Sequence, residues 1–160
     1  MSSNPTHPIQ IAGLKRELPL FEIKPGLKIA VLNILGDTEL VEACAKALAK
    51  KLETLEYDVI ITPEAKSIPI AYALSVATGK PYAVLRKNYK LYMGDATITK
   101  TLSITTGAPQ TLILDEKDSD LIKNKKVILI DDVISTGSTL KGMHQLMAKA
   151  KAKVVAETAI

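Results

Sequence analysis

The sequence is poor in aromatic residues. Phe, Tyr and Trp together make up 4% of its 160 residues and Trp is absent, while apolar residues of all kinds reach 47%. A buried core must therefore be built mainly from Ile, Leu, Val and Ala. This composition favours a sheet packed under helices, and the length suits one compact domain over residues 1–160.

Cysteine and long apolar runs are also scarce. The only cysteine, Cys44, excludes an internal disulfide, and its place on the apolar face of an expected helix predicts a buried thiol. No apolar run reaches the roughly 18 residues of a membrane span, and the polar start with Pro5 and Pro8 does not resemble a signal peptide. We therefore expect a cytoplasmic protein with no membrane partner.

Positive charge is only slightly in excess. The formal net charge is +4, from 21 Lys and Arg against 17 Asp and Glu. A basic balance can indicate nucleic-acid binding, but the lysines are dispersed and few rings could stack on bases. We expect no nucleic-acid partner, because a small anionic substrate accounts for this bias equally well.

The apolar pattern predicts alternating helices and strands over most of the chain. Leu40, Cys44 and Leu48 recur at helical spacing, and Asp37 or Thr38 can cap that helix. Helices are predicted at residues 38–55, 67–78 and 138–150, and strands at 59–61, 82–85, 111–114, 127–130 and 154–156.

The remaining segments carry weaker signals. We expect residues 1–10 to be frayed and residues 11–36 to be irregular, because prolines and glycine interrupt short apolar pieces. Residues 86–110 alternate weakly and indicate a long β-hairpin or flexible lid. Residues 115–126 are predicted to form a charged, exposed connection.

The predicted strands are continuous apolar runs that alternate with helices. This pattern favours an α/β fold with a central parallel sheet flanked by helices on both faces. In such sheets ligands bind at the carboxyl ends of the strands. The loops expected at that edge are 62–67, 86–110 and 131–139.

The most informative segment runs from Val127 to Thr139. An apolar strand ends there, and a loop of small hydroxylated residues and glycine leads into a helix. Backbone N–H groups and hydroxyls at a helix N-terminus predict an anion site, and Gly137 permits close approach of a phosphate. No lysine follows at P-loop spacing, so a Walker-type nucleotide site is not expected.

Two adjacent carboxylates, Asp131 and Asp132, stand between that strand and that loop. Such a pair repels itself and is costly unless it is solvated, bound to a metal or hydrogen-bonded to a ligand. The vicinal hydroxyls of a sugar are good donors to it. Together with the anion site, the pair predicts a ligand that is a phosphorylated sugar.

This segment resembles, position by position, the signature of type I phosphoribosyltransferases. The resemblance implies their fold, with a small N-terminal hood over residues 1–36 and the 86–110 hairpin as lid. It also implies binding of 5-phosphoribosyl-1-pyrophosphate (PRPP), with the aspartates on the ribose hydroxyls and the small-residue loop on the 5′-phosphate. Members of this family are commonly homodimers, so the resemblance implies a homodimer.

The resemblance covers nearly the whole chain. Residues 63–69 are similar to the pyrophosphate loop of the purine members, the basic pair at 86–87 to the start of their lid, and residues 18–40 to the hood of adenine members. The implied catalytic residues are Glu64, Lys66, Arg86, Lys87, Asp131 and Asp132, and the implied substrate-binding residues are Asn33, Ala65, Ser67, Asp131, Asp132, Ser135, Thr136, Gly137, Ser138 and Thr139.

The implied reaction joins PRPP and a purine base to give a nucleoside 5′-monophosphate and pyrophosphate. Mg²⁺ is the implied cofactor, held mostly through PRPP and water, with Asp131 and Asp132 as candidate ligands. The hood makes adenine the first candidate base. The alternatives are a hypoxanthine/guanine or xanthine enzyme, or a non-catalytic PRPP-sensing regulator; the hood and the Glu-Ala loop argue against a pyrimidine member.

Three features depart from the adenine members. Lys66 stands where they usually carry Arg, which keeps the charge without the bidentate geometry. The lid stretch 103–107 lacks their glutamate, as bacterial xanthine members also do, so we expect no general base from the lid. The chain ends at Ile160, where relatives usually continue, so we expect base recognition to be incomplete or supplied differently.

Overall fold

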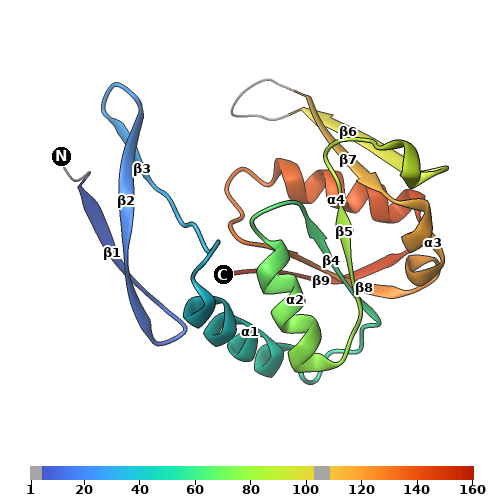
Figure 1. The fold of residues 1–160 in the computed structure, drawn as a ribbon, viewed down its shortest axis with the longest axis horizontal. Coiled ribbons are helices and arrows are strands. Elements are labelled where there is room, and N and C mark those ends of the chain that lie inside the picture. The colour runs from blue at the N-terminus through green and yellow to red at the C-terminus, as the bar shows by residue number, and fades with distance from the viewer. Residues whose placement is uncertain (1–4, 103–108) are drawn as a thin grey trace.

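The computed structural model describes residues 5–102 and 109–160. Helices and strands alternate through most of the chain, as predicted (Figure 1). In chain order the elements are β1 (Thr6–Ile11), β2 (Leu14–Lys24), β3 (Leu27–Ala30), α1 (Thr38–Leu52), β4 (Val59–Pro63), α2 (Ile68–Thr78), β5 (Tyr82–Leu85), the 3₁₀ helix η1 (Leu91–Met93), β6 (Thr97–Leu102), β7 (Pro109–Leu114), α3 (Glu116–Ile122), β8 (Lys126–Asp131), α4 (Ser138–Lys149) and β9 (Lys153–Ala159).

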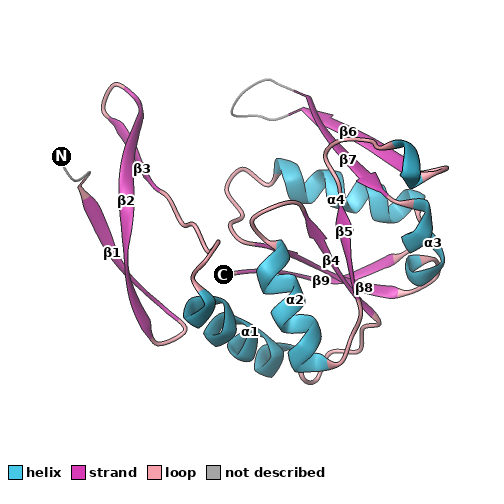
Figure 2. Cartoon of the chain, in the orientation of Figure 1, coloured by secondary structure: helices cyan, strands magenta, loops and turns pink. Residues whose placement is uncertain are grey.

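A parallel sheet with strand order β5-β4-β8-β9 occupies the centre of the molecule. Helix α2 connects β4 to β5 and helix α4 connects β8 to β9. Figure 2 shows α1 and α2 on one side of this sheet and α4 on the other. The predicted α/β fold with a parallel sheet flanked by helices is therefore confirmed.

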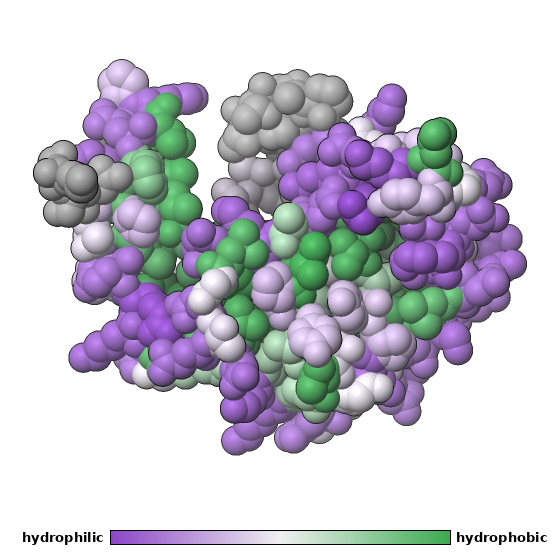
Figure 3. Space-filling view, in the orientation of Figure 1, coloured by the Kyte–Doolittle hydropathy of each residue, from purple (hydrophilic) through white to green (hydrophobic). Residues whose placement is uncertain are grey.

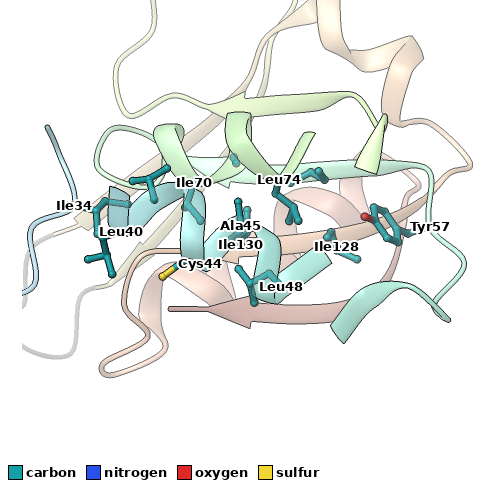
Figure 4. Close-up of a cluster of buried hydrophobic side chains, with 13 residues drawn as sticks. Ile34, Leu40, Cys44, Ala45, Leu48, Tyr57, Ile70, Leu74, Ile128 and Ile130 are labelled. Atoms are coloured by element: carbon teal, nitrogen blue, oxygen red, sulfur yellow. The ribbon is translucent and has the colours of Figure 1, made fainter. Parts of the chain in front are cut away.

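Side chains along the central strands point alternately to the two faces of the sheet, and both faces are packed. Ile60 and Ile128 point into the cluster under α1 and α2, where Cys44 is buried as predicted (Figure 4). Their neighbours Ile61 and Leu129 point into a second cluster against α4. Because both faces are covered, the strands must be apolar at every position, which is why their sequences read as continuous apolar runs.

The N-terminal prediction was wrong. Residues 6–30 form a three-stranded antiparallel sheet, β1-β2-β3, rather than a frayed end and an irregular stretch; residues 1–4 lie outside the described residues. β2 continues through Pro19 because its partner changes there, from β1 before this residue to β3 after it. This sheet is mostly exposed, so its strands lack the apolar alternation that would have indicated them.

From here on, the hood means strands β1–β3. Arg16 links the hood to the start of α1. Its guanidinium donates from Nε to Asp37 Oδ2 at 2.6 Å and from Nη2 to Asp37 Oδ1 at 2.9 Å. Asp37 in turn caps α1, because Oδ1 accepts the Leu40 N–H at 3.1 Å. One carboxylate thus anchors the hood and begins the helix, as the capping signal predicted.

Two further segments differ in extent from the prediction. The 115–126 connection contains helix α3, which Asp115 caps by accepting the Lys117 N–H and which buries Ile122. Strands β6 and β7 pair as a hairpin that begins and ends later than the predicted 86–110, and the strand predicted at 111–114 is the last four residues of β7. In the described part of the chain, no helix is long and apolar enough to cross a membrane.

Candidate active site at the carboxyl edge of the sheet

The three predicted loops leave from adjacent positions on one edge of the sheet. Pro63 at the end of β4 pairs with Leu85 at the end of β5, and Ile61 of β4 pairs with Leu129 of β8. The loops after these strands therefore start side by side, as the parallel order requires (Figure 1). Residues predicted from three separate parts of the sequence gather at one edge.

The 132–137 loop and the start of α4 surround the position where an anion site is predicted, and we call this part of the structure the cradle. Gly137 precedes the helix with φ +76°, a left-handed conformation that glycine adopts without strain. The Thr136 and Ser138 hydroxyls lie 3.2 Å apart. A cavity of about 190 Å³ opens here, lined by Gln110, Asp131, Val133, Ile134, Ser135, Thr136, Gly137, Ser138, Thr139 and Leu140.

Asp131 and Asp132 lie half-buried at the rim of this cradle. Partial burial raises the pKa of the Asp131 carboxyl to about 6; the adjacent Asp132 carboxylate adds to the rise, while the Asp132 N–H opposes it. The Asp132 N–H donates to Asp131 Oδ1 at 2.9 Å. Ionisation of Asp131 is thus costly in the unbound protein, and a ligand that donates hydroxyl hydrogens would offset that cost.

On the other side of the edge, Glu64 binds the start of the segment after β5. Arg86 Nε donates to Glu64 Oε2 at 2.6 Å, and the Lys87 backbone N–H donates to Oε1 at 2.6 Å. Partial burial alone would raise the pKa of the Glu64 carboxyl, but the Lys87 N–H and the Arg86 guanidinium outweigh it, and the net pKa is lowered. Glu64 therefore stays ionised and holds Arg86 in place.

The other predicted residues take different environments. The peptide bond between Glu64 and Ala65 is cis, and Ala65 and Lys66 are exposed. Ser67 is buried and donates to the Pro63 carbonyl at 2.7 Å, so its hydroxyl hydrogen is already used within the loop. Asn33 lies exposed in the β3–α1 connection, where its Oδ1 accepts the Leu35 N–H at 3.3 Å, and it is not among the residues that line the cradle's cavity.

The donor set suits a hard cation only in part. Within residues 5–102 and 109–160, no cluster of three or more His, Cys, Asp or Glu side chains could hold a metal by itself. Asp131 and Asp132 offer carboxylate oxygens, the donor type that Mg²⁺ prefers. They fit an Mg²⁺ ion that takes most of its ligands from substrate oxygens and water.

One lining residue, Gln110, was missed by the sequence prediction. It is the second residue of β7 and lines the same cavity as Ser135 to Thr139. The sequence did contain an indication of this role. Residues 110, 112 and 114 share one face of β7, and Gln110 is the polar residue on a face whose other two residues are leucines. Only the position of α4 reveals that this face meets the cradle.

The side of the hood that faces the rest of the molecule is apolar. Figure 3 shows hydrophobic surface gathered along that side. Exposed apolar side chains of β2 and β3 supply it: Phe21, Ile23, Leu27 and Ile29. The hood thus presents an exposed apolar surface of the kind that marks a binding or interaction face.

This fold is that of the type I phosphoribosyltransferases. The family model described as "Phosphoribosyl transferase domain" matches residues 31–160, and the chain belongs to that family. Among solved structures, the crystal structure of adenine phosphoribosyltransferase from Thermoanaerobacter pseudethanolicus superposes with a TM-score of 0.73 over 88% of this chain and 80% of that one. Their sequences are 22% identical, so this likeness concerns the fold.

Curated relatives carry several activities. The adenine phosphoribosyltransferase of Thermosipho africanus is 31% identical over 88% of this chain and 80% of its own length. A hypoxanthine/guanine phosphoribosyltransferase of Methanococcus maripaludis is 34% identical over 75% of this chain and 60% of its own length. The purine biosynthesis transcriptional repressor PurR of Bacillus subtilis is 30% identical over 82% of this chain and 46% of its own length.

Proposed function

We propose that this protein is a purine phosphoribosyltransferase that converts PRPP and a free purine base, with adenine as the first candidate, into a nucleoside 5′-monophosphate and pyrophosphate. The observation that carries the proposal is the adjacency of the Ser135–Thr139 cradle and the paired carboxylates of Asp131 and Asp132. A phosphate in the cradle would place the sugar that bears it beside those carboxylates.

The cradle and the aspartates would bind the ribose 5-phosphate half of PRPP. Backbone N–H groups at the start of α4 and the hydroxyls of Thr136 and Ser138 would donate to the phosphate oxygens. Asp131 and Asp132 would accept hydrogens from the two ribose hydroxyls. Breaking the bond at the anomeric carbon builds positive charge on the ribose ring, and the same carboxylates would stabilise that charge.

The leaving pyrophosphate would face the opposite loops. Glu64 fixes the Arg86 guanidinium, and the exposed Lys66 and Lys87 lie on the same two loops. These cations would attract the pyrophosphate and stabilise the charge that it gains as it leaves. Bound Mg²⁺ would neutralise part of the pyrophosphate charge.

The base would lie under the hood. The apolar side of β2 and β3 supports stacking of a purine ring, and the Arg16–Asp37 ion pair keeps the hood attached beside the carboxyl edge. Similarity to both adenine and hypoxanthine/guanine enzymes supports a purine. We place adenine first because the adenine relative is matched over the larger share of its own length.

Assays with separate bases test this proposal. Purified protein with Mg²⁺ and PRPP is mixed in turn with adenine, hypoxanthine, guanine and xanthine, and nucleotide formation is followed by absorbance and chromatography. We expect rapid AMP formation with adenine. Rapid product with another base would correct the substrate, and the absence of product with any base would contradict the enzymatic proposal.

A PRPP-binding regulator is the second candidate, and similarity to the repressor PurR favours it. The Asp131–Thr139 site would serve it equally well, because binding requires the phosphate cradle and the carboxylates but no turnover. Calorimetry in the same experiments distinguishes the two. PRPP binding without product from any base would favour a regulator, whereas neither binding nor product would contradict both functions.

The family resemblance also supports a homodimer. Tyr72 and Val76 expose apolar surface on α2. Light scattering of the purified chain would test this, with twice the chain mass expected and the single-chain mass contradicting it.

A further inference from the structure

Gln110 occupies an unusual place on β7. Its side chain shares one face of the strand with Leu112 and Leu114, which are buried against Met143 and Leu146 of α4. Gln110 continues this face beyond the apolar cluster, at the point where it reaches the beginning of α4. A polar side chain therefore stands where the face meets the phosphate cradle.

The position of Gln110 is set by packing along the whole of α4. Near the start of the helix, the Thr139 hydroxyl donates to Gln110 Oε1 at 3.3 Å. At its end, Lys149 Nζ donates to the carbonyl of Ile98 at 2.7 Å, on the strand paired with β7. The hairpin strands are thus held to α4 at both ends, and Gln110 belongs to a fixed wall of the cavity.

The chemistry of the amide decides what this wall can do. Because Oε1 accepts from Thr139, the NH₂ group is the end of the side chain that remains to interact with a ligand. Among residues 5–102 and 109–160 it has no hydrogen-bond acceptor. A neutral double donor beside a set of backbone N–H groups suits a phosphate and adds no charge.

We propose that Gln110 is a binding residue for the phosphate of the phosphorylated sugar, donating from its NH₂ group while Thr139 holds its oxygen. This inference rests on the proposed function, whose site it completes from a different part of the chain. The cradle would then be built from two elements, the start of α4 and β7. The phosphate would be held from the side as well as from the helix axis.

Two substitutions separate this role from a purely structural one. Gln110→Glu keeps the size and the oxygen that accepts from Thr139 but removes the donors and adds charge. Gln110→Met keeps the size and neutrality but removes both the donors and the oxygen. Loss of the N–H donors is the one change that both variants share. Gln145→Glu, on the exposed face of α4, makes the same charge change away from the cavity and serves as control.

Calorimetry with ribose 5-phosphate and with PRPP gives the decisive comparison, with circular dichroism to verify that each variant folds. We expect both Gln110 variants to lose about tenfold or more in affinity for both ligands, with Gln145→Glu binding like the wild type. Wild-type affinity in either Gln110 variant would overturn the inference. Failure of the wild-type protein to bind either ligand would overturn the proposed function and, with it, this role.

Discussion

Arg86 and Glu64 form an ion pair between neighbouring loops, with Arg86 Nε 2.6 Å from Glu64 Oε2. The Lys87 N–H occupies the second carboxylate oxygen at 2.6 Å, so Glu64 holds both the side chain and the backbone of the segment after β5. This bidentate contact joins the loop after β4 to the start of the segment that leads into the hairpin. We expect the pair to position Arg86 for pyrophosphate.

Glu64→Gln tests this positioning. The amide oxygen can still accept the Lys87 N–H, but Arg86 loses its charged partner, so we expect turnover to fall about tenfold. Steady-state rates with varied PRPP measure the effect. Glu56→Gln is the control, because Glu56 pairs with Lys126 on the exposed surface. Full turnover in Glu64→Gln would contradict this role for the ion pair.

Asp131 should make the unbound protein less stable as the pH rises. Its folded pKa, about 6, lies above the ordinary aspartate value of 3.8, so the folded state binds more protons than the unfolded state between these values. The free energy of unfolding therefore decreases from about pH 4 to pH 6 and stays lower above pH 6. Below pH 4 Asp131 is protonated in both the folded and the unfolded state, so the free energy of unfolding there has its full, higher value.

The Asp131→Asn variant has no carboxyl group at this position, so it does not lose this stability as the pH rises. We expect the variant to gain roughly 1–2 kcal/mol at pH 7.5 and almost nothing at pH 4, a range reduced because part of the carboxyl faces water. Urea unfolding with EDTA and without ligand measures both values. The same variant should bind PRPP more weakly, although it is more stable. Equal gains at both pH values would contradict the linkage.

Gly137→Val should abolish PRPP binding. An added Cβ meets no atom of the protein within 4 Å, so the side chain would occupy space open to the ligand, and the φ of +76° adds strain. Gly79→Val, at φ +66° after α2, has the same open space and comparable strain far from the cradle. By calorimetry, we expect binding to be lost only at Gly137. Equal losses at both glycines would indicate a general defect in folding.

Asp37→Ala and Asp37→Asn separate the two roles of Asp37. The Ala variant loses the cap of α1 and should cost about 1 kcal/mol of stability. The Asn variant keeps a capping oxygen but loses the charge that binds Arg16. We expect the Asp37→Asn variant to melt near the wild-type temperature and to have a higher KM for the base. An unchanged KM would show that the ion pair does not position the hood.

The central sheet and the cradle could be predicted because their physical causes are local. Continuous apolar strands, helix caps and a glycine before α4 all leave direct traces in the sequence. The hood could not, because β1 to β3 are stabilised by pairing with one another on a largely exposed sheet, which imposes no apolar alternation. Likewise α3 depends on the Asp115 cap and the burial of Ile122, which a charged composition conceals.

Contacts between distant parts of the chain limited prediction of the site. The motifs located Asp131 to Thr139, but Gln110 joins them only because β7 packs along α4. The partnership of Glu64 and Arg86 also depends on the order of β4 and β5 in the sheet. The contact of Asn33 with the base stays a prediction. The predicted loss of the lid glutamate concerns residues 103–107, which lie outside the described residues.

The most direct test of the account is turnover and PRPP binding by the double variant Asp131→Asn, Asp132→Asn. Both amides keep the size of the carboxyl groups but cannot accept two ribose hydroxyls with the strength of a charged pair. We predict a folded protein that binds PRPP at least about tenfold more weakly and loses most of its nucleotide formation. A folded double variant with near-normal binding and turnover would contradict the assignment of this edge of the sheet as the active site.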